Sequence, residues 1–154
     1  MTVATFIVCE DGNEYSDRFT RLIGREFGFV RAGSHAELIA ALARDDPRTI
    51  AGLLFDLDFR RTPAAALLDE SGQTRADRTE SDRRRLAPVQ GILILRALRA
   101  AAISLPALLF ADLDDQAQAA FLTQSLAPID IIPSSAALAE IARAMRALAA
   151  RTRQ

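Results

Sequence analysis

Two apolar runs that end in acids, Thr5-Phe6-Ile7-Val8-Cys9-Glu10-Asp11 and Gly52-Leu53-Leu54-Phe55-Asp56, decide the fold of this chain. Short apolar runs of this length are typical of strands that are buried on both faces of a parallel sheet. The carboxyl ends of parallel strands meet at one edge, and open α/β sheets bind their ligands there. We therefore expect Glu10, Asp11 and Asp56 to gather at that edge as an acidic pocket.

The composition is that of an ordinary globular domain with an unusual choice of basic residue. The chain has 154 residues, 50% of them hydrophobic, and a formal net charge of −1, so we expect neither nucleic acid nor a membrane as partner. All 19 basic residues are Arg, and no Lys can supply an ammonium group to the acidic pocket. We find no apolar stretch of membrane-spanning length, no signal peptide and only a lone Cys9. These features predict a single cytoplasmic domain.

Strand-like and helix-like segments alternate along the chain, which is typical of βαβ units and a parallel sheet. The expected strands cover residues 4–9, 29–32, 50–55, 105–110 and 129–132. The expected helices follow Asn13 and end at Gly28, begin at Ser34 and stop before Asp45, and cover residues 91–102, 116–126 and 136–151. Five strands and five helices with right-handed crossovers predict a compact α/β fold.

Residues 60–88 break this alternation. The segment is polar and Arg-rich, and it is longer than the connections usual in α/β units. Residues 64–68 predict one or two helical turns, and we expect the remainder to be a flexible insertion. We interpret Arg83-Arg84-Arg85 as part of a solvated flexible loop, with a protein-docking element as the second interpretation. Nearby acids make a nucleic-acid patch the weakest interpretation.

In order and spacing, these segments resemble the receiver domain of bacterial two-component response regulators. Glu10-Asp11 match the acidic pair after strand 1, Asp56 matches the phospho-accepting Asp after strand 3, and 105–110 is similar to strand 4. The resemblance covers nearly everything outside 60–88. It implies a flavodoxin-like (βα)5 fold: a parallel five-stranded sheet in the order 2-1-3-4-5, with helices on both faces and a long insertion between strand 3 and helix 3.

The departures from the family indicate an atypical receiver, or pseudo-receiver. The Thr or Ser that follows strand 4 in the family falls on Ala111, and the Lys that precedes Pro after strand 5 is missing before Pro133. The Pro usual four residues after the acceptor is Arg60, and the connection from Asp56 to Gly91 is far longer than the family's compact loop. The resemblance therefore implies that the metal-binding half of the site persists and the phosphoryl-sensing half is lost.

The acids are candidates for a Mg²⁺ site, with no other cofactor expected. Glu10, Asp11 and Asp56, together with the backbone carbonyl of Asp58, provide the oxygen ligands that Mg²⁺ requires. The plainer interpretation makes Glu10 and Asp11 solvated acids at a helix start, Asp58 a turn residue, and Asp56 an inert strand-end acid instead of a phospho-acceptor. Arg60 is a weak candidate for pairing with phosphate.

We expect an interaction module and not an enzyme. A single His and a single Cys leave few routes to acid–base or nucleophilic catalysis, and no dinucleotide fingerprint appears. The leading hypothesis is a receiver-like signalling domain, with phosphorylation lost or vestigial, that binds a signalling protein or a histidine kinase. The alternative is a working phospho-receiver of a two-component phosphorelay that accepts phosphate on Asp56 with Mg²⁺. A flavin binder is disfavoured because the acids after the first strand repel phosphate, and a decarboxylase wing lobe is weaker still.

The expected contact surface, also the candidate homodimer surface, comprises helix 116–126, strand 129–132 and helix 136–151, a face that receivers commonly use. Its apolar candidates for partner binding are Phe121, Leu122, Ile131 and Ile132, and a second docking candidate is the insertion with Arg83, Arg84 and Arg85.

Overall fold

A single five-stranded parallel sheet organises the chain, of which the computed structural model describes residues 3–152. The strands run in the order β2-β1-β3-β4-β5, and every neighbouring pair is parallel. Their bounds are Thr5–Cys9 for β1, Gly28–Ala32 for β2, Ile50–Asp56 for β3, Ala107–Phe110 for β4 and Ile129–Ile132 for β5. The predicted flavodoxin-like order 2-1-3-4-5 is confirmed.

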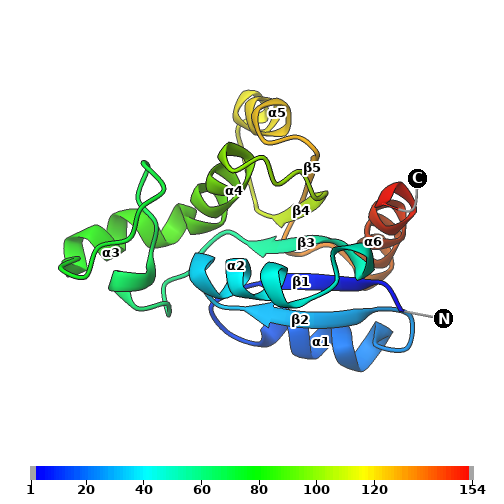
Figure 1. Ribbon diagram of the computed structural model, residues 1–154. Helices are drawn as coiled ribbons and strands as arrows, with labels where there is room; N and C mark the ends of the chain where they lie inside the picture. Colours follow the sequence, from blue (N-terminus) through cyan, green and yellow to red (C-terminus); the bar gives the residue numbers. More distant parts are fainter. Residues whose placement is uncertain (1–2, 153–154) are drawn as a thin grey trace.

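Helices cover both faces of the sheet (Figure 1). One face carries α1 and α6, and the other carries α2, α4 and α5. The bounds are Glu14–Ile23 for α1, His35–Arg44 for α2, Gln90–Ala100 for α4, Gln116–Ser125 for α5 and Leu138–Thr152 for α6. None of the helices in residues 3–152 combines the length and the apolar character needed to cross a membrane.

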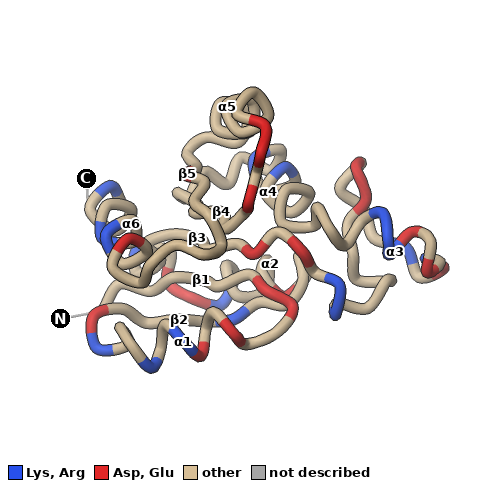
Figure 2. Tube along the Cα trace, turned by 180° about the vertical axis from the view of Figure 1, so that it is seen from behind, with Lys and Arg blue, Asp and Glu red and all other residues tan. Residues whose placement is uncertain are grey.

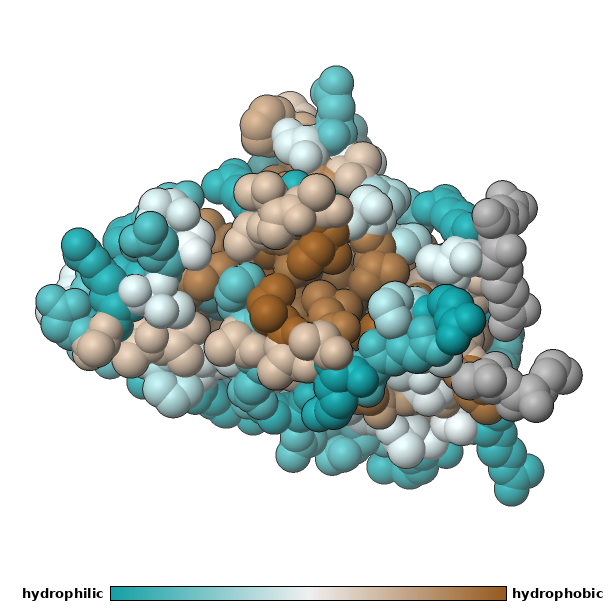
Figure 3. Space-filling model, in the orientation of Figure 1, coloured by the Kyte–Doolittle hydropathy of each residue, from teal (hydrophilic) through white to brown (hydrophobic). Residues whose placement is uncertain are grey.

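Alternation along the strands divides the core into two layers. Successive strand side chains point to opposite faces. Phe6 and Val8 of β1 accordingly pack with Phe19 of α1, whereas Ile7 and Cys9 pack on the α2 and α4 side. Figure 3 shows apolar surface gathered between α2 and α4, over the middle of that second face. The sequence pattern did not indicate this patch.

The first helix is shorter than the sequence predicted. It ends at Ile23 with Gly24 as its C-cap, and Gly28 begins β2 instead of ending the helix. Phe27 fits the helical apolar spacing but is buried from the turn, where its ring meets that of Phe6 edge-on at a centroid distance of 5.2 Å. The pattern identified a core residue correctly and assigned it to the wrong element.

The insertion contains a helix that the sequence pattern did not predict. Helix α3, Glu80–Leu86, projects with its neighbouring turns away from the sheet (Figure 1). Thr79 and Asp82 form a reciprocal capping box at its start, which supplies partners to exposed backbone N–H groups. The remaining short elements are 3₁₀ turns at Pro47–Thr49, Ala64–Ala66 and Ala87–Val89.

The base of the insertion is packed into the core, contrary to the expected flexible loop. Leu67, Leu68 and Leu86 are at most 1% exposed. Gln90, itself 1% exposed, accepts a hydrogen bond from the N–H of Leu68 at 2.8 Å and donates one to the carbonyl of Leu68 at 3.1 Å. The expectation rested on the polar, charged composition of the segment, which does not reveal that these few leucines pack into the core. Flexibility of the exposed part beyond Leu68 stays a prediction.

Candidate functional site at the carboxyl edge of the sheet

The strands end in register, and this brings the predicted site residues to one edge. Cys9 lies beside Phe55, and Asp56 lies beside Phe110. Glu10, Asp56 and Ala111 therefore follow one another along the edge. Figure 2 shows acidic segments gathered where β1, β3 and β4 end, with a basic segment of the insertion beside them.

Glu10 caps the first helix. It is 1% exposed, and its carboxylate accepts hydrogen bonds from the backbone N–H of Tyr15 at 3.1 Å and of Ser16 at 2.8 Å. A carboxylate at a helix start satisfies free N–H groups and complements the positive end of the helix dipole. Glu10 thus lies at the helix start, as the plainer interpretation from the sequence has it, but it is buried and not solvated.

Asp11 is held by Arg61, an arginine of the insertion. The carboxylate of Asp11 accepts from the backbone N–H of Arg61 at 2.7 Å and lies 3.2 Å from its guanidinium, and the Asp11 side chain is only 3% exposed. The same guanidinium reaches Glu14 at 2.7 Å. That hydrogen bond lowers the pKa of Glu14 to about 2. The positive charge of Arg61 is therefore held next to Asp11, in the acidic pair Glu10-Asp11.

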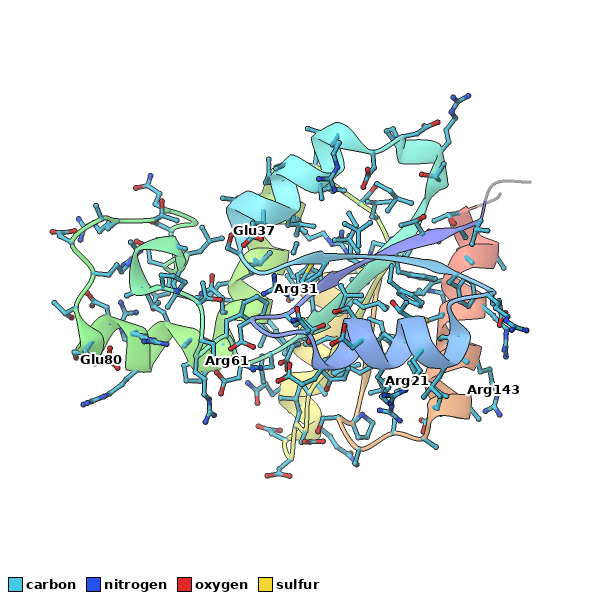
Figure 4. The ribbon with its side chains drawn as sticks, turned by 90° about the horizontal axis from the view of Figure 1, so that it is seen from below. Arg21, Arg31, Glu37, Arg61, Glu80 and Arg143 are labelled. Atoms are coloured by element: carbon cyan, nitrogen blue, oxygen red, sulfur yellow. The ribbon has the colours of Figure 1, made fainter. Side chains whose placement is uncertain are left out.

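A second arginine supports this loop from the neighbouring strand. Arg31 of β2 donates hydrogen bonds to the backbone carbonyls of Gly12 and Asp11, the latter at 3.0 Å. Figure 4 shows Arg31 and Arg61 lying close together beside the start of α1. The loop that carries the acidic pair is thus fixed by two guanidinium groups.

Asp56 ends β3 half-buried among other acids. Burial, together with the nearby charges of Asp11 and Glu10, raises the pKa of Asp56 to about 6. Its Oδ1 accepts from the N–H of Leu57 at 2.8 Å. Tyr15 stacks on Phe110 at 4.7 Å between ring centroids, and burial and the charge of Asp56 raise its pKa to about 12. The tyrosine ring therefore stands close to the acids.

The raised pKa of Asp56 predicts a pH-dependent gain in stability for Asp56→Asn. The native carboxyl group binds its proton more tightly than the unfolded one, whose pKa is about 3.9. The stability that Asp56 contributes is therefore complete below about pH 4 and lost as pH rises to about 6. At pH 7 the variant should be about 1 kcal/mol more stable than the wild type, after discounting for solvent screening.

Urea unfolding of both proteins between pH 4 and pH 7.5 measures this difference. Asn keeps the size of Asp and an oxygen that accepts from Leu57. The matched control is Asp114→Asn on the exposed loop after β4, where no such trend is expected. A difference that does not grow with pH would contradict the assignment.

Asp58 and Arg60 form a pair of their own. The guanidinium of Arg60 lies 2.6 Å from Asp58 Oδ2, and its side chain is 79% exposed. Asp58 Oδ1 is buried, with no hydrogen-bond partner among residues 3–152. The predicted pairing of Arg60 with phosphate has no support in this geometry, because Asp58 already engages its guanidinium.

The acids as arranged do not fit a Mg²⁺ site. Within the described part of the chain, no three His, Cys, Asp or Glu side chains are placed to hold a metal ion. Glu10 is engaged by two backbone N–H groups and Asp11 by Arg61. The predicted ligand set of Glu10, Asp11, Asp56 and Asp58 therefore shares one edge without forming a coordination shell.

The loops that contain Ala111 and Pro133, where the family's switch residues are missing, contact each other through neighbouring residues. Ala111, 6% exposed, follows β4, and Pro133 follows β5. Asp112 accepts hydrogen bonds from the backbone N–H of Ser134 at 3.1 Å and from its hydroxyl at 2.5 Å. The loops after β4 and β5 are thus joined by hydrogen bonds from a serine to a carboxylate.

The predicted partner surface is only partly available. Phe121 is 61% exposed on α5, and Ile131 and Ile132 are half-buried. Leu122, in contrast, is 3% exposed and packs in the core, so its assignment as a partner contact is wrong. The helix turns Leu122 inward while its neighbour Phe121 faces out. A groove of about 760 Å³ between α5, β5 and α6 includes Ile131 and Ile132.

The three consecutive arginines of the insertion have different environments. Arg85 pairs with Glu70, and Arg83 lies 3.9 Å from Glu80. Arg84 is exposed and makes no ion pair with any residue from 3 to 152. All three belong to α3 instead of a loop.

Comparisons with known proteins agree with the fold. No protein-family model matches the chain, and no curated protein matches it in sequence. Among solved structures, the receiver domain of a Francisella response regulator matches with a TM-score of 0.67 and 13% identity, over 97% of this chain and 98% of that one. A response regulator receiver domain protein from Clostridium thermocellum matches with a TM-score of 0.67 and 12% identity, covering 98% of both chains. A structure described as adenylate cyclase from Rhodopirellula baltica matches with a TM-score of 0.65 and 14% identity, over 97% of this chain and 90% of that one. The fold is therefore the one that receiver domains have.

Proposed function

We propose that this chain is a receiver-like signalling domain that works by binding a protein partner, with phosphorylation of Asp56 lost or vestigial and without enzymatic activity. The observation that carries the proposal is the contact of Arg61 with Asp11 and Glu14. It places a permanent positive charge where a receiver would gather acids around a metal ion. The receiver fold supports the signalling role, and cytoplasmic location stays a prediction.

Electrostatics at the edge argue against phosphoryl transfer. Transfer to a carboxylate requires cations that screen the developing charge. Here the Arg61 guanidinium next to the Asp11 carboxylate is already shared with Glu14, and the chain has no Lys. Asp112 adds a further acid near Tyr15, and Ala111 offers no hydroxyl. A phosphoryl group on Asp56 would meet repulsion with little to offset it.

Protein binding is the function that the remaining surface supports. Phe121 exposes a large apolar side chain on α5, and a separate, partly apolar groove lies between α5, β5 and α6. Exposed apolar patches of this kind mark interaction sites more often than chance surfaces do. A signalling protein, a histidine kinase or a second copy of the chain would satisfy this face.

One observation favours the alternative of a working phospho-receiver. Asp56 sits at the end of β3 in the neighbourhood of Glu10 and Asp11, whose charges raise its pKa. The same crowding of carboxylates would attract Mg²⁺ if Arg61 moved away. The two functions therefore differ in whether Arg61 stays in place.

Amide chemical shifts during a Mg²⁺ titration, with and without beryllofluoride as phosphoryl mimic, test the proposal. We expect weak Mg²⁺ binding and no response to beryllofluoride in the wild type. Arg61→Ala should bind Mg²⁺ about fivefold more tightly, because it removes a positive charge 3.2 Å from Asp11.

The matched control is Arg48→Ala, which removes an equal charge that pairs with Asp46 before the start of β3, at the opposite edge of the sheet. Its Mg²⁺ affinity should stay close to the wild-type value. A shift of Asp56 and of α5, β5 and α6 when beryllofluoride is added to the wild type would establish the phospho-receiver and overturn our proposal.

A further inference from the structure

A cleft lies between the insertion helix and the end of β3. It has a volume of about 520 Å³, and its charged lining consists of Asp58, Arg60, Arg61, Glu80, Arg83 and Arg84. Ala87 and Pro88 supply an apolar part of the wall. We call this feature the arginine cleft. Figure 4 shows Arg61 and Glu80 both on the insertion side of the molecule.

The arginine cleft carries a surplus of positive charge. Four Arg face two acids in its lining, and because Arg61 pairs with acids outside that lining, a surplus of one positive charge remains in a chain of net charge −1. Asp58 is matched by Arg60, and Arg61 is matched by Asp11 and Glu14. The surplus therefore resides on α3, where Arg83 has only a long contact with Glu80 and where Arg84 makes no ion pair within the described residues.

We propose that the arginine cleft binds an acidic segment of a protein partner, whose carboxylates pair with Arg83 and Arg84. Guanidinium groups bind carboxylates with two parallel hydrogen bonds, which gives both strength and orientation. The two arginines are consecutive on a helix, so their side chains diverge and suit successive carboxylates better than one compact anion. The proposal rests on the interaction role proposed above, but not on the loss of phosphorylation.

The lining favours a peptide over a nucleotide. The residues that line the cleft include no aromatic ring on which a base could stack. Pockets of 300–1,000 Å³ that hold small ligands usually enclose most of the ligand's surface, whereas this cleft is open to solvent. The cleft instead offers separated charges along a wall, with Ala87 and Pro88 available for an apolar side chain of the peptide.

Fluorescence anisotropy with a fluorescein-labelled hexaglutamate peptide tests the proposal on the full chain at low salt. The double variant Arg83→Ala/Arg84→Ala should bind the peptide about tenfold more weakly, because two charge-assisted pairs are lost. The matched control is Arg21→Ala/Arg143→Ala, which removes the same charge from exposed arginines on α1 and α6, away from α3 (Figure 4). This control should bind within about twofold of the wild type.

A gain-of-affinity variant separates binding from folding. Glu80→Gln removes the acid nearest Arg83 and should bind the peptide about two- to threefold more tightly. Equal losses in both double variants would mean attraction by net charge alone and would overturn the proposal. The proposal would also be overturned if ATP or inorganic phosphate displaced the peptide at concentrations where a tetraglutamate competitor has no effect. Phosphorylation of Asp56 would refute the proposed function and leave this result standing.

Discussion

Gly91→Ala should lower the free energy of unfolding by about 3 kcal/mol, the upper end of the usual effect of overpacking. Gly91 is in the first turn of α4, and its N–H donates to the carbonyl of Leu57 at 3.0 Å. A Cβ at this position would overlap the carbonyl oxygen of Asp56 and approach the Cα of Leu57 to 3.2 Å. These are backbone atoms at the end of a central strand and cannot move aside cheaply.

Two effects of opposite sign compete in this variant. Alanine is favoured over glycine in a helix by about 1 kcal/mol. The overlap with Asp56 should outweigh this gain, because relief requires that either α4 or the end of β3 shift. Gly28→Ala is the control, since its Cβ would meet only the hydroxyl of Thr5 at 3.0 Å and that side chain can rotate.

Urea unfolding followed by circular dichroism measures both variants, and amide chemical shifts locate the disturbance. We expect the shifts of Gly91→Ala to centre on Asp56 and Leu57. Stability equal to the wild type would mean that α4 is not packed against the end of β3 as described.

Leu86→Ala should lower the free energy of unfolding by about 2–4 kcal/mol. Leu86 ends α3, is completely buried and belongs to the same core cluster as Leu53 and Phe55 of β3. Truncation removes buried apolar surface and leaves a cavity between the insertion and the core. The prediction separates a packed insertion from the flexible loop that the composition indicates.

Val89→Ala is the matched control for this variant. Val89 lies three residues further along and is 39% exposed, so its truncation should change the stability by at most about 0.5 kcal/mol. The urea midpoint with an unchanged slope is the readout for both proteins. Equal small effects in the two variants would mean that the insertion is a flexible loop that does not pack against the core.

The sheet could be predicted from sequence because each strand is an apolar run with its own boundary signals. Val8 and Phe55 are buried whatever the details of the connections, and the alternation with helices then leaves few topologies. Thr79 and Asp82 also form a local signal, a capping box, but a surrounding excess of charge concealed it. Local patterns thus explain most of the fold.

The site could not be predicted to the same depth because its key contacts are distant in sequence. Arg61 is 50 residues from Asp11, and Asp112 is 22 residues from Ser134. The sequence indicated Arg60 as the relevant arginine, yet the chain direction after β3 places the next residue over the acidic pair. No periodicity or motif distinguishes two adjacent arginines, since only tertiary packing decides which carboxylate each one meets.

Arg61 borders both the acidic pair and the arginine cleft, so these two sites share one charge. By thermodynamic linkage, whatever draws this guanidinium toward the cleft weakens its hold on Asp11, and the reverse effect has the same size. An anion at one site and a cation at the other would therefore assist each other's binding through the position of a single side chain. The insertion interrupts the regular alternation of strands and helices. Through Arg61 it would in this way determine the net charge of the acidic pocket beside it.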